Sequence, residues 1–272
     1  MIELVPRPVV VGVGPETSMA TVDVAAAEAR SRHLPLRLLA THPAAGSGPH
    51  ETLTAVLRRV CAVWPGLPVT ARNVTGEAGT LLVAASRTAA VVVVGQDRVG
   101  ACAAQVAAHA LCPTMVVPVG VPRTDGPVLL GLSVEPGEEP AIEFAFDAAA
   151  RRGVPLVVAH VWAGLPGDAL GAVDPFAFDL RQAYAAADRM IAESVAGWGE
   201  KFPDVEVDRM PLHDPDPART LLDASAMAGL VVVGARRLDR HSGQSLGRVP
   251  RTLLGAAGCP VTVVRLTRPA YP

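Results

Sequence analysis

Lysine, aromatic residues and long apolar runs are all scarce in this chain of 272 residues. Lys201 is the only lysine, so arginine supplies nearly all of the positive charge, and the formal net charge is −2. Because the arginines are interspersed with similar numbers of acids, the chain has no basic surface of the kind that binds nucleic acid or anionic membranes. No apolar stretch approaches the ~20 residues that cross a bilayer. The sequence therefore predicts a protein without nucleic-acid or membrane partners.

The start of the chain and its cysteines exclude two further classes. Glu3 and Pro6 precede a short apolar run that stops at Gly12, which is typical of a strand and not of a secretory signal. We therefore expect a cytoplasmic protein. No two cysteines form a CxxC pair, and none has a histidine at metal-ligand spacing. We expect no metal site, and we expect all four to be buried small apolar residues: Cys61, Cys102, Cys112 and Cys259.

Apolar residues make up half of the chain, and their pattern repeats. Strands are predicted at residues 9–13, 36–40, 69–74, 91–94 and 114–119, with helices between them. The same order then starts again: residues 128–132 correspond to 9–13, residues 231–234 to 92–95, and Cys259-Pro260 to Cys112-Pro113. This agreement indicates a tandem duplication, with a first domain at 1–121, a second at 126–272, and a linker near 120–127.

Strands that alternate with helices require a parallel sheet with right-handed crossovers and helices on both faces. The predicted fold class is α/β, with two tandem, open, doubly wound, five-stranded parallel-sheet domains. Ligands of such sheets bind beyond the C-terminal ends of the strands, where the strand order reverses. We expect one crevice at residues 12–15 and 95–100 and another at 131–134 and 234–248. The second half also contains an inserted loop at 163–175, which either covers its crevice or is solvated.

The sequence resembles the universal stress protein family, in the tandem two-domain form common among actinobacteria. The similarity rests on VVVGVG at 9–14, LVVAHV at 156–161, VVVGARR at 231–237 and, most of all, GCPVTVVR at 258–265. The resemblance implies a Rossmann-like, adenine nucleotide hydrolase-like fold, association through the last strand, and a role in stress or dormancy regulation without turnover chemistry. Some members bind ATP through a loop of form GxxGx9G[ST], assisted by an aspartate after the first strand.

On that pattern the second half keeps the glycine spacing but changes residues within it. Arg237 replaces the second glycine, and Arg248 replaces the hydroxyl residue. The resemblance implies an ATP or anion site at Ser133, Val161, Val233, Gly234, Arg237, Gly247 and Arg248. In the first half, Gly95 and Cys112 are 17 positions apart, against 25 for Gly234 and Cys259. Since the phosphate loop is shortened there, we expect the first site to be lost. The family's aspartate is absent from both halves, where Gly14 and Ser133 take its place.

Other polar clusters have structural explanations. Asp216 is expected to cap a helix that has Pro217 at its first position. His160 ends an apolar strand and is expected to make a structural hydrogen bond. The arginines of residues 234–251 create a positive field for a triphosphate or an acidic protein, or they belong to a solvated loop. No pair of acids in either crevice suggests general acid and base catalysis.

Three hypotheses follow. The first is a non-catalytic regulatory or scaffold protein whose domains pack as an intramolecular pseudo-dimer and whose ligand binding is largely lost. The second is an ATP-binding sensor that uses the second crevice alone. The third is an enzyme on the related nucleotide-hydrolase fold. We favour the first, which requires no cofactor and leaves open a homodimer and an unidentified protein partner.

Overall fold

The computed structural model describes residues 6–14, 17–42, 50–96, 101–133, 136–162, 180–236 and 246–266. The first half contains β1 (Val9–Val13), α1 (Met19–Ser31), β2 (Leu36–His42), α2 (His50–Val63), β3 (Val69–Thr75), α3 (Ala78–Ala85), β4 (Val91–Gly95), α4 (Ala101–His109) and β5 (Thr114–Val117). The second half contains β6 (Val128–Gly131), α5 (Glu139–Arg152), β7 (Leu156–Trp162), α6 (Leu180–Ser194), α7 (Trp198–Lys201), β8 (Val207–His213), α8 (Pro217–Ala224), the 3-10 turn η1 (Ser225–Met227), β9 (Leu230–Ala235), α9 (Arg248–Ala256) and β10 (Val261–Arg265).

Each half is the doubly wound parallel sheet that the sequence predicts. The strands of the first half lie in the order β3-β2-β1-β4-β5, and those of the second half lie in the equivalent order β8-β7-β6-β9-β10. Every neighbouring pair within a half is parallel. The strand order reverses between β1 and β4 and between β6 and β9, so the two expected crevices lie at these strand ends.

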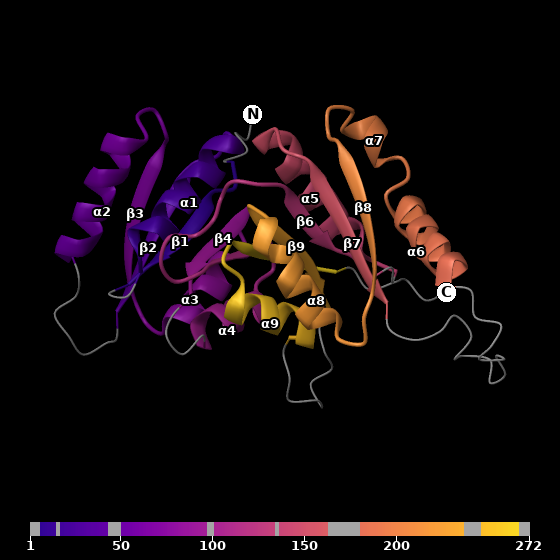
Figure 1. The fold of residues 1–272 in the computed structure, drawn as a ribbon. Helices are drawn as coiled ribbons and strands as arrows, with labels where there is room; N and C mark the ends of the chain where they lie inside the picture. Colours follow the sequence, from indigo (N-terminus) through magenta and orange to yellow (C-terminus); the bar gives the residue numbers. More distant parts are fainter. Residues whose placement is uncertain are drawn as a thin grey trace, which may run out of the picture.

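Helices cover both faces of the sheet, because the strands are apolar on both faces. Val9 and Val11 pack into one core with side chains of α1, α2, α5 and α6, whereas Val10 packs into a second core with α3, α4, α8 and α9. Figure 1 shows these two helical layers on opposite sides of the strands. Side chains that alternate between two buried faces produce the uninterrupted valine runs of the sequence.

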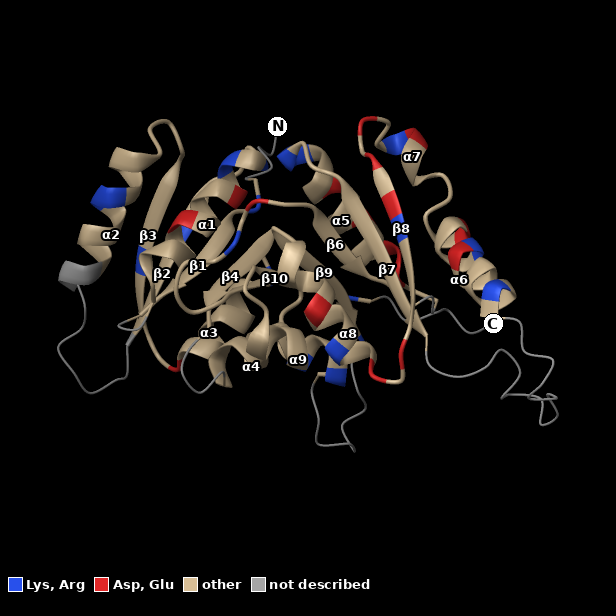
Figure 2. Cartoon of the chain, viewed as in Figure 1, with Lys and Arg blue, Asp and Glu red and all other residues tan. Residues whose placement is uncertain are grey.

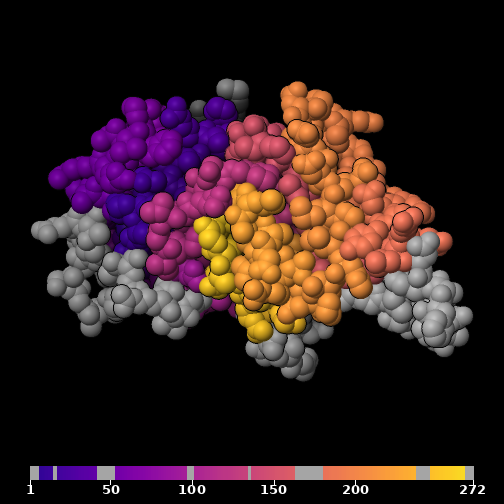
Figure 3. Space-filling view, viewed as in Figure 1, coloured from indigo at the N-terminus to yellow at the C-terminus, as the bar shows by residue number. Residues whose placement is uncertain are grey.

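The two halves share one sheet. β5 and β10 pair in antiparallel register, with Val116 opposite Val261 and Met115 opposite Thr262. Because a Cys-Pro pair precedes both strands, Met115 and Thr262 are equivalent positions of the two copies, and the pairing is therefore pseudo-symmetric. The halves form one continuous surface in the space-filling view (Figure 3). The ten-stranded sheet is the intramolecular pairing expected of a pseudo-dimer, and its outer edges are β3 and β8.

The segment predicted as a linker packs against the second half. The backbone N–H of Arg123 donates to the carbonyl of Gly258 at 2.9 Å, and that of Gly229 donates to the carbonyl of Pro127 at 2.9 Å. Gly126 has φ = 108°, and a Cβ built there would lie 2.5 Å from the carbonyl oxygen of Met227. The segment is therefore fixed to the turn before β9, and Gly126 is required by both backbone conformation and space.

The expectation for the cysteines was correct only in part. Cys259 is buried, Cys102 and Cys112 are half-buried, and Cys61 is exposed. Cys61 follows the buried Val60 directly in α2, so the helical rotation of about 100° per residue turns it away from the core. In the described part of the chain, no helix is long and apolar enough to cross a membrane.

Candidate ligand sites at the two crevices

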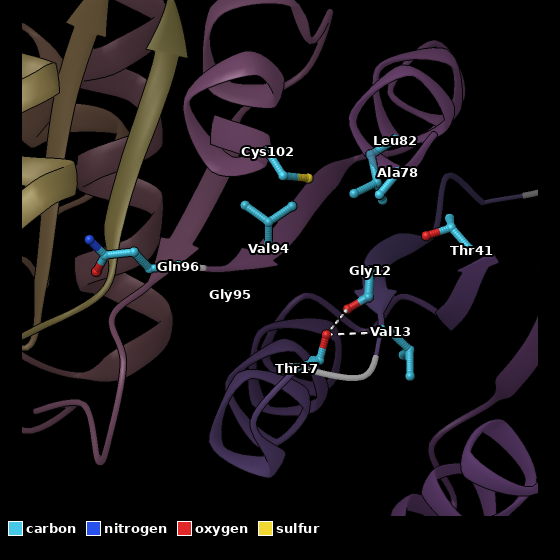
Figure 4. Close-up of a pocket in the computed structure, with 11 residues that line it drawn as sticks. Gly12, Val13, Thr17, Thr41, Ala78, Leu82, Val94, Gly95, Gln96 and Cys102 are labelled. Atoms are coloured by element: carbon cyan, nitrogen blue, oxygen red, sulfur yellow. Dashed lines mark hydrogen bonds between the residues drawn. The ribbon is translucent and has the colours of Figure 1, made fainter. Parts of the chain in front are cut away.

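A cavity of about 230 Å³ lies at the first crevice, beyond the C-terminal ends of β1 and β4 (Figure 4). Its walls come from Val13, Ala78, Leu82, Val94 and Cys102, and its polar side chains are those of Thr17, Thr41 and Gln96. No charged side chain is among the described residues that line it. The flanking helices α3 and α4 also contain no Lys, Arg, Asp or Glu, in contrast to α8 (Figure 2). The described lining of the first crevice is therefore mostly apolar and contains no charged side chain.

The glycines at this crevice are explained by packing inside the protein. A Cβ at Gly12 would lie 3.0 Å from Leu82 Cδ1, and one at Gly95 would lie 2.9 Å from Thr21 Oγ1. Both neighbours are buried. These glycines therefore allow helices α1 and α3 to approach the strand ends, and they do not by themselves indicate a bound phosphate.

Thr17 closes the loop after β1 onto itself. Its hydroxyl accepts a hydrogen bond from the N–H of Gly14 at 2.8 Å and donates to the carbonyl of Gly12 at 3.4 Å (Figure 4). The sequence left open whether Thr17 or Ser18 caps α1. In the structure Ser18 is the cap, and its Oγ accepts from the N–H of Thr21 at 3.2 Å. The hydroxyl of Thr17 thus satisfies two backbone polar groups at the end of β1.

The connection after β4 is shorter than the equivalent connection after β9 in the second half. β4 ends at Gly95 and α4 begins at Ala101, whereas β9 ends at Ala235 and α9 begins at Arg248. The N–H of Gln96 is bonded to the carbonyl of Val117 at 2.8 Å, so the chain stays close to the sheet as it leaves β4. A connection of this length has few backbone N–H groups with which to surround a triphosphate.

At the second crevice, the structure brings together several of the residues that the family resemblance singled out. Gly131 of β6 pairs with Ala159 of β7 and Val233 of β9, so the residues just beyond these positions share one edge of the sheet. On this edge lie Ser133, Val161, Val233 and Gly234. Arg237 lies outside the described residues, as does the loop at 163–175.

Ser133 has a hydrogen-bond partner within the protein at this edge. The hydroxyl of Ser133 donates to Oε1 of Glu138, a buried side chain that sequence reasoning did not single out. Val233 is buried, and a Cβ at Gly234 would lie 2.5 Å from Leu266 Cδ2, so Gly234 has a packing role as well. Glu138 immediately precedes Glu139, the first residue of α5, and its position in the sequence gave no sign that it was buried.

Gly247 and Arg248 begin helix α9. Gly247 is the N-cap residue and makes no side-chain cap, and Arg248 Nη2 lies 2.7 Å from Oδ2 of Asp216. Oδ1 of Asp216 accepts from the N–H of Arg219 at 3.2 Å and so caps α8, with Pro217 as its first residue. The predicted cap is confirmed. The additional ion pair to Arg248 was not foreseen, because the two residues are far apart in the sequence.

His160 has the structural role that the sequence predicts. It is buried in β7, and its Nδ1 lies 3.0 Å from the carbonyl oxygen of Leu132. This hydrogen bond joins the ends of β6 and β7 below the second crevice. Within the described residues, no group of three His, Cys, Asp or Glu side chains has an arrangement suited to a metal ion.

Several solved structures have the same fold over the whole tandem chain. A putative universal stress protein from Pseudomonas aeruginosa aligns with a TM-score of 0.64 at 15% identity, covering 96% of this chain and 94% of that one. A universal stress protein from Archaeoglobus fulgidus aligns with a TM-score of 0.63 at 13% identity, covering 94% of this chain and 98% of that one. At such identities the likeness establishes the fold alone.

Sequence comparison gives the family. The sequence model of the Universal stress protein family matches residues 126–265. A universal stress protein of Mycobacterium tuberculosis is 40% identical over 139 residues, which are 51% of this chain and 45% of that relative, so the match spans about half of the relative's length. One of Mycobacterium bovis is 32% identical over 217 residues, 75% of this chain and 68% of its own. This chain belongs to the universal stress protein family.

Proposed function

We propose that this protein is a non-catalytic regulatory or scaffold protein of the cytoplasmic stress response, with nucleotide binding lost in the first half and degenerate in the second. Membership of the universal stress protein family supports the stress-related role. The proposed loss of nucleotide binding is supported by the 230 Å³ cavity of the first crevice, whose described lining has no charged side chain. A nucleotide triphosphate needs basic side chains or several free N–H groups around its phosphates.

The second crevice supports a weakened nucleotide site. The hydroxyl of Ser133 is bonded to Glu138, and Arg248 is paired with Asp216. A phosphate would have to displace or share these partners. Because Arg248 and Asp216 are exposed, their ion pair is worth at most about 1 kcal/mol, so it weakens anion binding without abolishing it.

An ATP-binding sensor that uses the second crevice alone is the alternative. It is favoured by the N-terminus of α9, where Gly247 provides no side-chain cap and the basic Arg248 follows at once. A helix N-terminus with free N–H groups and a neighbouring arginine attracts anions. The two functions therefore differ in whether this end of the second half holds a nucleotide.

The pairing of β5 with β10 also bears on partners. Because each last strand is already hydrogen-bonded to the other, a second chain cannot use those edges. We propose that any homodimer, or any complex with a protein partner, forms on another surface of the ten-stranded unit. In this proposal, partner proteins bind to the outer surface of the pseudo-dimer.

Nucleotide titration of the full chain tests the proposal. We expect any residual binding to be too weak to change the melting temperature, or to give calorimetric heat, with ATP, ADP, AMP or cyclic AMP at millimolar concentration. A ligand at 100 times its Kd would add about 2.7 kcal/mol of stability. Two variants separate the alternatives: Arg248→Ala alters the second crevice, and Ala78→Phe fills the cavity of the first.

A shift with ATP that disappears in Arg248→Ala would establish the sensor instead. A shift that disappears in Ala78→Phe would contradict the loss of binding in the first half. Phosphate release above a control without protein would contradict the non-catalytic assignment.

A further inference from the structure

The cavity of the first crevice has a size that suits one small ring. Its volume of about 230 Å³ is below the range of about 300–1,000 Å³ in which drug-sized ligands bind. It is above the roughly 150 Å³ of an apolar cavity that holds benzene. A molecule of one ring with a short substituent therefore matches the available space.

Apolar side chains from three elements surround this space. Val94 of β4, Cys102 of α4, and Ala78 and Leu82 of α3 all line it. Figure 4 shows Cys102 and Val94 on one side of the cavity and Ala78 and Leu82 on another. Val94 and Leu82 are buried. Because a sulfur atom makes favourable contacts with aromatic rings, these walls favour an aromatic ligand.

The three polar side chains of the lining differ in whether they can reach a ligand. The hydroxyl of Thr17 is bonded to two backbone groups at the end of β1. Gln96 is directed away from the other lining residues, and its Nε2 donates to the carbonyl of Gly255 in α9 at 3.4 Å (Figure 4). The hydroxyl of Thr41 points into the cavity (Figure 4). Since a hydroxyl both donates and accepts, Thr41 can bond to one polar group of a ligand.

The described lining does not favour an ion. It contains no charged side chain, and α4 begins with Ala101 where the equivalent helix α9 begins with Arg248. Transfer of an ion from water into an apolar site without an opposite charge or several hydrogen bonds is costly. The lining therefore selects an uncharged molecule.

The helices that form the walls are held in place without a ligand. The carboxylate of Glu77 accepts from the N–H groups of Gly79 at 2.8 Å and Thr80 at 2.6 Å and so caps α3. A Cβ at Gly79 would lie 2.2 Å from Oε1 of Gln105, so α3 and α4 are in close contact. A preformed site loses little conformational entropy on binding, which allows a small ligand to bind.

We infer that the cavity of the first crevice binds a small, uncharged aromatic molecule with one hydroxyl group. Its ring packs against Val94, Leu82 and Cys102, and its hydroxyl bonds to Thr41. The inference goes beyond the proposed function, because it assigns a ligand to the half whose nucleotide binding is proposed to be lost. It does not depend on whether the second crevice holds a nucleotide. Nucleotides and the aromatic ligand are titrated separately, so the two proposals fail independently.

Calorimetric titration of the full chain with 4-ethylphenol tests the inference. This compound has one ring, a short apolar substituent and a hydroxyl that is neutral at pH 7. We expect saturable binding with a Kd of about 1 mM, which is typical of a ligand of this size. The anion 4-ethylbenzoate and the cation 4-ethylbenzylammonium should not bind measurably, because no charged side chain of the described lining compensates them.

Variants at Thr41 and Ala78 locate the site. Thr41→Val keeps the shape of the side chain but removes the hydroxyl, and should weaken binding about fivefold through the lost hydrogen bond. Thr41→Ser keeps the hydroxyl and should restore most of the affinity. Ala78→Phe fills the cavity from α3 and should abolish binding while leaving the circular dichroism spectrum intact. The matched control is Thr70→Val, at an exposed position of β3 outside the cavity, which should leave binding unchanged.

Three outcomes would overturn the inference. They are absence of saturable 4-ethylphenol binding to the wild type, equal binding of either ion, and unchanged binding by Thr41→Val or by folded Ala78→Phe. If Ala78→Phe does not fold, the comparison of Thr41→Val with Thr41→Ser still decides, because neither substitution adds volume to the cavity.

Discussion

Replacing Glu28 by glutamine tests the ion-pair cluster that joins α1 to α5. Glu28 is only 3% exposed. Its carboxylate accepts from Arg32 Nε at 2.5 Å and lies 3.4 Å from Arg152 Nη2 and 3.8 Å from Arg151 Nη2. Arg32 also approaches Asp147 of α5 at 3.4 Å. A single carboxylate of the first half therefore holds two arginines of the second half together with one of its own.

The expected loss of stability arises because the substitution leaves arginines without their acidic partner. In Glu28→Gln, Asp147 still pairs with Arg32 and Arg151, whereas Arg152 loses the acid with which it is paired. Removing one partner of a buried ion pair costs 3–5 kcal/mol, because the other charge stays buried without compensation. The arginines are partly exposed, so we expect the lower end, about 3 kcal/mol. That corresponds to at least about a hundredfold change in the ratio of folded to unfolded protein.

Urea denaturation of the full chain at pH 7 measures this loss. The matched control is Asp188→Asn, which breaks the exposed pair between Asp188 and Arg209 and should cost no more than about 1 kcal/mol. Equal losses in the two variants would refute the assignment of Glu28 as the principal charge between the halves.

The pH dependence provides a second check. Burial would raise the pKa of Glu28, but Arg32, Arg152 and Arg151 outweigh it and hold the pKa below its ordinary value. The carboxylate therefore stabilises the folded state fully above the pKa of an unfolded glutamate, about 4.3. This contribution is lost as the pH falls through the lower pKa of the folded state. The stability difference between wild type and Glu28→Gln should shrink over that range, and a difference independent of pH would contradict the reasoning.

Two further predictions concern the linker and the thiols. Gly126→Ala should destabilise the chain by about 2–3 kcal/mol in thermal denaturation, because φ is 108° and the new Cβ would meet the backbone of Met227. The control is Gly199→Ala, which should leave the stability unchanged because nothing lies within 4 Å of the added carbon. Burial raises the pKa of Cys112 and of Cys259 to about 11, so these thiols stay neutral in the folded chain while unfolded thiols ionise above a pH of about 8.5. Stability should therefore decline as the pH rises from about 8.5 to 11, by about 3 kcal/mol per thiol, and replacing both cysteines by alanine should remove this part of the decline.

The order of strands and helices could be predicted because it depends on local patterns. Uninterrupted valine runs at β1 and β4 indicate strands buried on both faces, and the structure places these strands at the centre of the first half. Asp216 followed by Pro217 is a helix start that needs no tertiary information, and α8 begins there. The repeat itself was visible because equivalent strands of the two halves kept similar residues.

The hydrogen-bond and ion-pair partners at the crevices were harder to predict from the sequence. Thr17 and Ser18 are both residue types that cap helices. In the structure Thr17 accepts a hydrogen bond from Gly14 after β1, whereas Ser18 caps α1, and residue type alone does not distinguish these roles. The partner of Arg248 is Asp216, from the preceding helix of the second half. Such pairs depend on how the connections return to the sheet, which side-chain periodicity does not specify.

By itself, the sequence determined the α/β class, the duplication, the two crevices and the shortened loop of the first half, since each follows from residue type and spacing along the chain. Only the tertiary structure decided how the halves meet. Glu28 is one polar residue of an otherwise ordinary helix, and it becomes a buried charge because antiparallel pairing of β5 with β10 brings α1 against α5. Contacts between residues more than a hundred positions apart are set by the geometry of the assembled sheet, and no local pattern encodes them.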